Sequence, residues 1–367
     1  MDAKQVIEKA KEGAANPWKS GKGRSLGDIF TQGQVQPDFA FSGLPVGKLG
    51  ILIGPPGAGK SFLCLQIALM VACGKEAPIG CSIGKIWQPE SQNYEGQEII
   101  SALPFGRPII YYNFEDDAVQ TENRINHIVS AFCLDESGDI NRAVRDAYDK
   151  NFHMQYLDGI AITLLQSRRE IFEKSPVILG MIEHIKEVGA KIVFIDTLRQ
   201  VIAGGEIDES VNSDMARIGQ ALSFIAKQAD CAIFMVHHVN KAALGADMRK
   251  DSSEETDETS GAGGINAFVR WRSKVSNFPE SLLKNGDVRY VESGSNIYQT
   301  IGKENRRQFV VYQVKKCNYI APQPPCYFKR LKGGCLKPIT LIDEQQVEKS
   351  ARNYGIAKGI VSIEDDE

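Results

Sequence analysis

Short apolar runs, rich in β-branched and aromatic residues, recur along the middle of the chain and are separated by stretches with helical periodicity. Each run is four to six residues long, which is typical of buried strands. The runs are residues 49–53, 109–114, 192–195 and 232–236. Between the last two, Met215, Ile218, Leu222 and Ile225 recur every three or four residues and predict one apolar helix face. Strands that alternate with helices predict a mostly parallel, twisted sheet flanked by helices.

The two ends of the chain have a different pattern. Residues 1–36 are polar and rich in Gly, Lys and Gln, which predicts a flexible arm or a short helix. After Arg270, short strand-like pieces joined by Pro- and Gly-containing turns predict antiparallel C-terminal edge strands; they are residues 309–314, 327–331 and 339–342. We therefore expect an N-terminal arm over residues 1–36, one α/β domain over 37–345, and a solvated tail over 346–367.

Composition narrows the class of protein without naming a function. Of 367 residues, 43% are hydrophobic and 24% charged, as in ordinary globular proteins. The net charge of −3 does not indicate a protein that coats nucleic acid, so any DNA-binding surface must be local. Neither a membrane-spanning run nor a secretory signal is recognisable, and we expect a cytoplasmic protein. The eight cysteines lack metal-ligand spacing, which favours small buried hydrophobic side chains over a disulfide or metal site.

The strongest chemical motif follows the first predicted strand. The sequence Gly54-Pro55-Pro56-Gly57-Ala58-Gly59-Lys60-Ser61 fits G-x-x-x-x-G-K-[ST], and Phe62 comes next in the predicted helix. In such a P-loop, backbone N–H groups surround the phosphates at the positive end of the helix. Lys60 is expected to reach the β- and γ-phosphates of ATP, and Ser61 to hold Mg²⁺. The alternative is a glycine-rich turn that binds no phosphate. The predicted strand before the motif and the predicted helix after it favour the P-loop over this alternative.

Carboxylates end two other predicted strands. Asp196 follows the apolar run 192–195, where a P-loop protein needs a magnesium-binding carboxylate, although capping of a helix at Thr197 would leave the same pattern. Glu115, Asp116 and Asp117 end the run 109–114. Glu115 could orient and deprotonate an attacking water, whereas acids at the start of a helix would also give this pattern. We expect one of these three to be catalytic and the others to be caps.

Two adjacent histidines, His237 and His238, end the run 232–236. Neighbours on an extended chain point apart, so joint metal ligation is disfavoured. A position beside a nucleotide site favours contact between one of them and the γ-phosphate.

The order of these motifs resembles the RecA-like ATPases, and in particular the RepA-type hexameric replicative helicases of plasmids and phages. The stretches that carry the resemblance, besides residues 54–61 and 114–116, are residues 195–199 with 212–215, 236–238 with Lys241, 269–271, and 316–319 followed by 333–334 and 336–338. They span most of residues 40–340.

The resemblance implies an ATP-dependent, ring-forming DNA helicase or translocase of the RecA-like fold, with ATP and Mg²⁺ as its ligands. It implies Glu115 as the catalytic carboxylate, Asp196 and Ser61 at Mg²⁺, and His238 as the γ-phosphate sensor. Arg270 resembles the arginine finger that enters a neighbouring subunit's site. Lys316, with Lys315 before it, resembles a second basic position that acts in trans, although a solvated strand end would have the same sequence. A finger in trans implies a homo-oligomeric ring, with six subunits in the family.

The implied partners are single-stranded DNA and an initiator or primase. Loops over residues 204–212 and 241–262 are expected to face the DNA, yet both are acidic, whereas phosphate binding relies on Lys and Arg. Two alternatives therefore stay open: a recombination or regulatory ATPase of the RadA or KaiC kind, and a nucleotide-dependent protein-binding scaffold. Residues 77–108 form a long connection that could be a lid, an oligomer contact or an insertion.

Overall fold

The computed structural model describes the side chains and backbone of most of the chain. The described residues are 24–32, 37–41, 43–74, 106–134, 137–238, 263–283, 286–292, 295, 297–319 and 325–342, with the backbone alone of 86–88 and 93–95. The chain divides into two compact units, residues 1–38 and 39–367. In the first unit, helix α2 (Leu26–Gln32) buries none of its side chains. It begins with reciprocal hydrogen bonds between Ser25 and Asp28, a capping box that satisfies the free N–H groups of a helix start.

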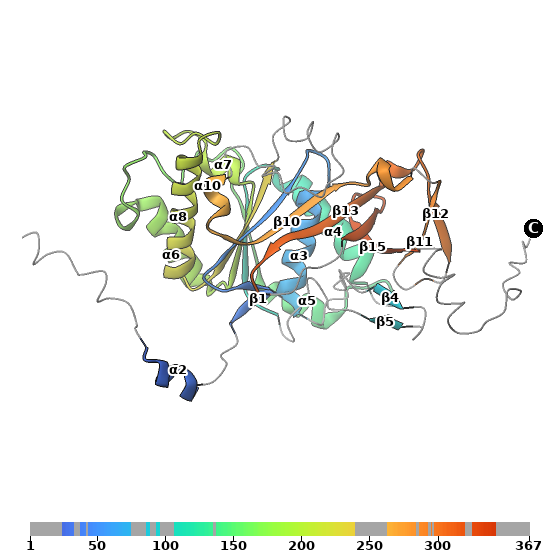
Figure 1. Cartoon of the computed structure of the whole chain (residues 1–367), viewed down its shortest axis with the longest axis horizontal. Coiled ribbons are helices and arrows are strands. Elements are labelled where there is room, and N and C mark those ends of the chain that lie inside the picture. The colour runs from blue at the N-terminus through green and yellow to red at the C-terminus, as the bar shows by residue number, and fades with distance from the viewer. Residues whose placement is uncertain are drawn as a thin grey trace, which may run out of the picture. The chain divides into compact units, whose positions relative to one another are not determined.

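An eleven-stranded sheet organises the second unit, in the order β12-β11-β15-β14-β13-β10-β3-β9-β8-β6-β7 (Figure 1). The parallel part contains β3 (Leu49–Gly54), β6 (Ile109–Asn113), β7 (Phe152–Tyr156), β8 (Ile192–Asp196), β9 (Ala232–His238) and β10 (Val269–Asn277). The antiparallel extension contains β11 (Val288–Glu292), β12 (Tyr298–Ile301), β13 (Phe309–Cys317), β14 (Cys326–Arg330) and β15 (Leu336–Leu341). Two small pairs lie outside it, β1 (Phe39–Phe41) with β2 (Leu44–Pro45) and β4 (Ile86–Gln88) with β5 (Asn93–Glu95).

Helices cover both faces of the parallel part, because its side chains alternate between two apolar cores. In β3, Leu52 belongs to one core while Ile51 and Ile53 belong to the other. The first core is closed by α3 (Lys60–Cys73), α4 (Ala118–Phe132) and α5 (Arg142–Asn151). The second is closed by α6 (Pro176–Val188), α7 (Leu198–Ile202), α8 (Asn212–Gln228) and α10 (Gly263–Asn266). Short 3-10 turns are η2 (Phe172–Lys174), η3 (Glu280–Leu283) and η4 (Arg306–Gln308).

The expected fold class is confirmed, but four strands of the eleven-stranded sheet were not expected. The largest omission is β10, which lies parallel to β3 and joins the parallel part to the antiparallel extension. Its sequence alternates strictly, with Val269, Trp271 and Ser273 buried. Arg270 and Arg272 are half-buried between them, and such cations mask a strand when only apolar runs are sought. The other three are β7, β11 and β12.

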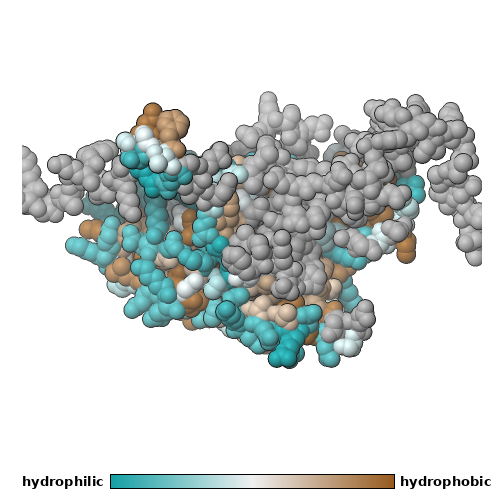
Figure 2. Space-filling model, turned by 90° about the horizontal axis from the view of Figure 1, so that it is seen from below, coloured by the Kyte–Doolittle hydropathy of each residue, from teal (hydrophilic) through white to brown (hydrophobic). Residues whose placement is uncertain are grey.

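The sequence predicts that the cysteines are small buried side chains outside any disulfide, and this prediction holds for most of those that the structure describes. The seven described cysteines are thiols that form no disulfide; Cys317 is half-buried and the others are buried. On the face shown in Figure 2, hydrophobic residues lie scattered among hydrophilic ones. No helix in the described part of the chain is long and apolar enough to cross a membrane.

Parallel pairing places the ends of β3, β6, β8 and β9 at one edge of the sheet. The motif 54–61 and the residues that follow β6 and β8 therefore meet there, at the carboxyl edge where open α/β sheets bind ligands.

Candidate active site

The P-loop joins β3 to α3 in a tight turn. Gly57 (φ +72°) and Gly59 (φ +94°) take left-handed backbone conformations that favour glycine. At Gly54 a Cβ atom would lie 2.3 Å from the carbonyl oxygen of Val275 on β10, so only glycine fits. Lys60 is only 5% exposed, and its Nζ donates to the carbonyl oxygen of Pro55 (2.9 Å). Burial lowers its pKa to about 8, although the charges of nearby carboxylates oppose the shift.

Asp196 ends β8 beside the P-loop and is fully buried. The hydroxyl of Tyr111 donates to its Oδ2 (2.8 Å), while no described residue donates to Oδ1. Burial raises its pKa to about 6, against hydrogen bonds from Tyr111 and Ser61 that lower it. The capping alternative is wrong, because α7 begins at Leu198 without a side-chain cap. A buried carboxylate oxygen without a donor, close to the Ser61 hydroxyl, is the hard-oxygen set that Mg²⁺ prefers.

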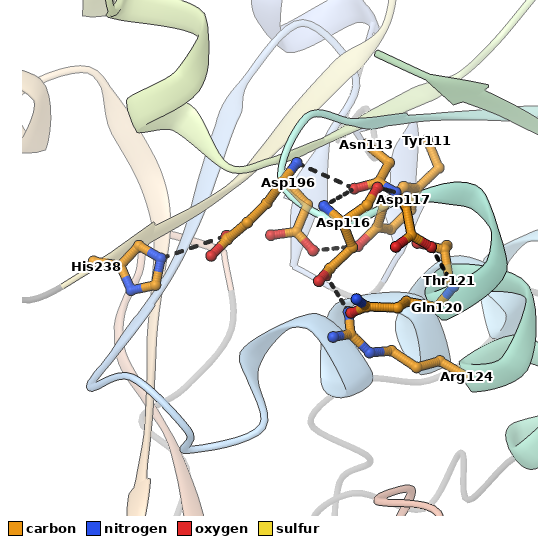
Figure 3. A network of polar contacts seen from close by, with 10 residues as sticks. Tyr111, Asn113, Asp116, Asp117, Gln120, Thr121, Arg124, Asp196 and His238 are labelled. Atoms are coloured by element: carbon orange, nitrogen blue, oxygen red, sulfur yellow. Dashed lines mark hydrogen bonds and ion pairs between the residues drawn. The ribbon is translucent and has the colours of Figure 1, made fainter. Parts of the chain in front are cut away.

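The three acids after β6 have three separate roles (Figure 3). Asp117 caps α4 by accepting a hydrogen bond from the Gln120 backbone N–H (2.7 Å). Asp116 forms an ion pair with Arg124 of α4. Asn113 fixes the turn, since its Nδ2 donates to the carbonyl oxygen of Asp116 (2.7 Å). Glu115 instead faces His238, so it is the candidate catalytic carboxylate among the three acids.

Glu115 pairs with the second histidine of β9. Oε2 of Glu115 lies 3.5 Å from Nε2 of His238, and both side chains are partly exposed. The hydrogen bond with His238 is the main cause that lowers the Glu115 pKa, and burial opposes it. Glu115 is therefore an ionised carboxylate at neutral pH and is available to accept a proton. The Glu115–His238 pair joins the ends of β6 and β9.

His237 points away from this pair, as expected for neighbours on a strand. It is fully buried, and its Nε2 lies 3.5 Å from Oε1 of Glu209, in the loop before α8. Oε2 of Glu209 lies 3.7 Å from Nε of Arg199. Despite the nearby carboxylate, burial lowers the pKa of His237 to about 4, so the ring is neutral at pH 7.

A pH-dependent stability is expected from this buried ring. The unfolded chain binds a proton near the ordinary histidine pKa of 6.5, whereas the folded chain binds it only near 4, so the stabilisation is complete well above pH 6.5 and falls as the pH decreases toward 4. Between pH 6.5 and 5 the loss is about 1.5 kcal/mol. Urea unfolding at both pH values measures it. His237→Asn should flatten this dependence, whereas His153→Asn on β7 should keep it; equal slopes in wild type and His237→Asn would contradict the assignment.

Arg330, which the sequence motifs did not indicate, lies against the P-loop. It ends β14, and its Nη2 donates to the carbonyl oxygen of Gly57 (2.8 Å). Its Nη1 is 3.1 Å from the place that a Cβ of Gly59 would take. The strand pair β14–β15 is held there by Gln66 of α3, whose side chain makes two hydrogen bonds to the backbone of Leu336 (2.9 and 2.8 Å). In the sequence, the only feature that could have pointed to Arg330 is its position shortly before Gly333-Gly334.

Arg270 and Lys316 lie together at the opposite edge of the sheet. β10 begins beside the start of β3, so Arg270 lies next to the amino end of β3, the strand whose carboxyl end carries the P-loop. Lys316 pairs in register with Arg272. Nη1 of Arg270 donates to the carbonyl oxygen of Ala267 (2.8 Å), and Nζ of Lys316 to that of Asn266 (3.1 Å). Neither side chain reaches the P-loop of its own chain.

Phe62, the last residue of the predicted nucleotide-binding set, follows the P-loop on α3 and is half-buried.

Comparison with known proteins gives the family. The model of a family described as AAA domain matches residues 34–243, more than half of the chain. The chain belongs to the AAA domain family. It is a P-loop ATPase by family, and membership implies nucleotide binding at the P-loop.

Two solved structures resemble this chain remotely. A KaiC-like protein from the hyperthermophilic archaeon Pyrococcus horikoshii OT3 is 11% identical, with a TM-score of 0.42 over 83% of this chain and 94% of that chain. The RadB recombinase is 13% identical, with a TM-score of 0.41 over 81% of this chain and 91% of that chain. The family assignment rests on the match to residues 34–243.

Proposed function

We propose that this protein hydrolyses Mg-ATP to move on single-stranded DNA as a ring-forming replicative helicase or translocase of the RepA type. The observation that carries the proposal is the end of β9. His238 contacts Glu115, the candidate catalytic carboxylate, while His237 contacts Glu209 in the loop expected to face DNA. Two adjacent residues of one strand thus touch the hydrolytic site and the candidate DNA loop. Such a connection is what a motor needs to convert hydrolysis into loop movement.

The acidity of that loop does not oppose the proposal, because its carboxylates have partners within the chain. Asp208 accepts hydrogen bonds from the backbone N–H and hydroxyl of Ser210. Glu206 accepts one from the backbone N–H of Arg168 (3.3 Å). Glu209 forms an ion pair with Arg199 (3.7 Å) and lies 3.5 Å from the neutral ring of His237. These contacts shape the loop, and Arg199 partly compensates its negative charge. The second expected loop, residues 241–262 with Lys241, lies outside the described residues.

Each polar group of the site has a task in this proposal. The P-loop N–H groups and Lys60 bind the phosphates, and Arg330 adds a cation on the side of Gly57. Ser61 and Asp196 would hold Mg²⁺, which supplies charge neutralisation for the phosphates when bound. Glu115 accepts the proton of the attacking water, and His238 holds Glu115 in place and is positioned to sense the γ-phosphate.

DNA-stimulated turnover is the expected result that tests the motor. We expect ATP hydrolysis by the full chain to rise severalfold with single-stranded DNA, and the stimulation to fade as salt rises, because phosphate contacts weaken steeply with salt. Turnover of a Lys60→Ala blank is subtracted. Hydrolysis that depends on Lys60 but ignores DNA would contradict the motor and favour the protein-binding scaffold. DNA-stimulated hydrolysis without strand displacement would favour a recombination or regulatory ATPase.

The ring and its arginine finger have a separate test. Because Arg270 lies far along the sheet from its own P-loop, we propose that it acts on the nucleotide of a second copy, with Lys316 beside it. Subunits with Arg270→Ala keep an intact P-loop, and subunits with Lys60→Ala keep an intact finger. Mixing the two inactive variants should restore part of the turnover, since some interfaces then combine both intact halves. No recovery at any mixing ratio would remove Arg270 from this role.

A further inference from the structure

A pocket opens at the amino-terminal ends of β3 and β10, at the opposite edge of the sheet from the P-loop. Its volume is about 440 Å³. The start of β3 (Gly47 to Leu49), the outer face of α8, the turn η2 and the start of β10 form its walls. Three residues of the candidate active site, Lys60, Glu115 and Asp196, are not among the lining residues.

Three cations line this pocket: Lys48, Lys227 and Arg270. None of the lining residues is acidic. Within the residues that the structure describes, no ion pair joins any of the three to a carboxylate. Like charges gathered without an anion repel one another, and in a chain of net charge −3 such a grouping is a local exception. The pocket is therefore suited to an anionic group.

Aromatic rings form the other walls, and neighbouring groups fix them in place. The rings of Phe172 and Phe224 lie 6.1 Å apart between centroids. The guanidinium of Arg217 lies over the Phe172 ring at 4.6 Å, and its Nε donates to the carbonyl oxygen of Arg168 (2.9 Å). Phe268 lies across α8 at Gly219, where a Cβ would approach its ring to 2.6 Å. The aromatic surface is thus formed before any ligand binds.

We propose that this pocket is a second nucleotide-binding site, which takes one nucleotide unit apart from the P-loop. Its phosphate lies between Lys48 and Lys227, and its base lies against the phenylalanine rings, with Gln220 and Ser223 as hydrogen-bonding groups for the base. Cations alone would suit any anion, and rings alone any apolar group. Their combination in a space of this size fits a phosphate joined to a flat, polar-edged ring. The unit is either a free nucleotide or one residue of single-stranded DNA.

The proposal goes beyond the motor, because ATP hydrolysis at the P-loop needs no second site. Lys48 and Lys227 have no part in the P-loop chemistry, so their substitution leaves that chemistry intact. Arg270 is kept unchanged in the test, since it is also the proposed finger.

The parent protein of the test carries Lys60→Ala, which disables the P-loop. It is compared with the pocket variant, which carries Lys48→Gln and Lys227→Gln in addition. Lys186→Gln/Lys303→Gln removes the same charge from exposed positions outside the pocket and is the matched control. Thermal melts verify folding. One arm measures anisotropy of fluorescein-labelled (dT)₁₀; the other measures binding of free dTMP, with thymidine as the ligand without phosphate.

We expect the pocket variant to bind at least one of the two probes about tenfold more weakly than the control, with a smaller slope of log K against log salt. Phe172→Leu should weaken the same probe about fivefold without changing that slope. Loss with dTMP identifies a free nucleotide as the ligand, and loss with (dT)₁₀ alone identifies a DNA strand. Unchanged binding of both probes in the pocket variant, or no binding of either to the parent protein, overturns the proposal. Neither of these outcomes affects the motor, which is judged by DNA-stimulated turnover of protein with an intact Lys60.

Discussion

Lys60→Ala is expected to lower ATP turnover by about a thousandfold or more, to the level of a protein-free blank. A single preorganised donor to developing charge contributes about 10²–10³ in rate, and Lys60 also contributes to phosphate binding in the ground state. The ammonium is buried next to Glu115 and Asp196, where its interaction with an anion is stronger than in water. Both turnover and affinity for Mg-ATP should therefore fall.

The variant should remain folded, which separates a chemical from a structural effect. In the described contacts Nζ of Lys60 makes a hydrogen bond only to the carbonyl oxygen of Pro55. Its removal ends the desolvation of one buried cation but also the attraction between that cation and Asp196 and Glu115, and the two effects oppose each other. The melting temperature should thus stay within a few degrees of that of wild type. Lys186→Ala, an exposed lysine on α6, is the matched control for both measurements. Turnover above one tenth of the wild-type value in Lys60→Ala would remove the P-loop assignment.

Glu115→Gln is expected to lower kcat by about 10²–10⁴ while affinity for Mg-ATP stays within a few-fold. The amide keeps the shape of the side chain and a hydrogen-bonding group toward His238, but it cannot accept the proton of the attacking water. Glu115 is the acid of its turn that pairs with His238 at the site, whereas Asp116 pairs with Arg124 and Asp117 caps α4. Single-turnover hydrolysis together with equilibrium nucleotide binding separates kcat from affinity.

The same turn provides the control for Glu115. Asp117→Asn keeps a good helix cap, so its turnover and stability should both stay close to wild type. If Asp116→Asn or Asp117→Asn lowered kcat as much as Glu115→Gln, the effect would be structural and the catalytic role of Glu115 would be lost. Turnover of Glu115→Gln within tenfold of wild type would also contradict a catalytic role of Glu115.

The sequence by itself determined the features that depend on neighbouring residues. The motif 54–61 between a strand and a helix fixed the nucleotide loop, and the apolar runs 192–195 and 232–236 gave the strands that carry Asp196 and the two histidines. These signals are local, because a strand, a helix or a P-loop needs a pattern within about ten residues. The same patterns were sufficient for the α/β class with antiparallel C-terminal strands.

Only the tertiary structure decided which distant side chains meet. Arg330 reaches Gly57 across 273 residues of sequence because strand pairing carries β14 to the side of α3. The fold gives Glu115, Asp116 and Asp117 three different partners: His238, Arg124 and the backbone N–H of Gln120. The same holds for His237, whose contact with Glu209 depends on how the loop before α8 folds back onto β9. Sheet order is set by the packing of the whole core, so no local pattern specifies these contacts.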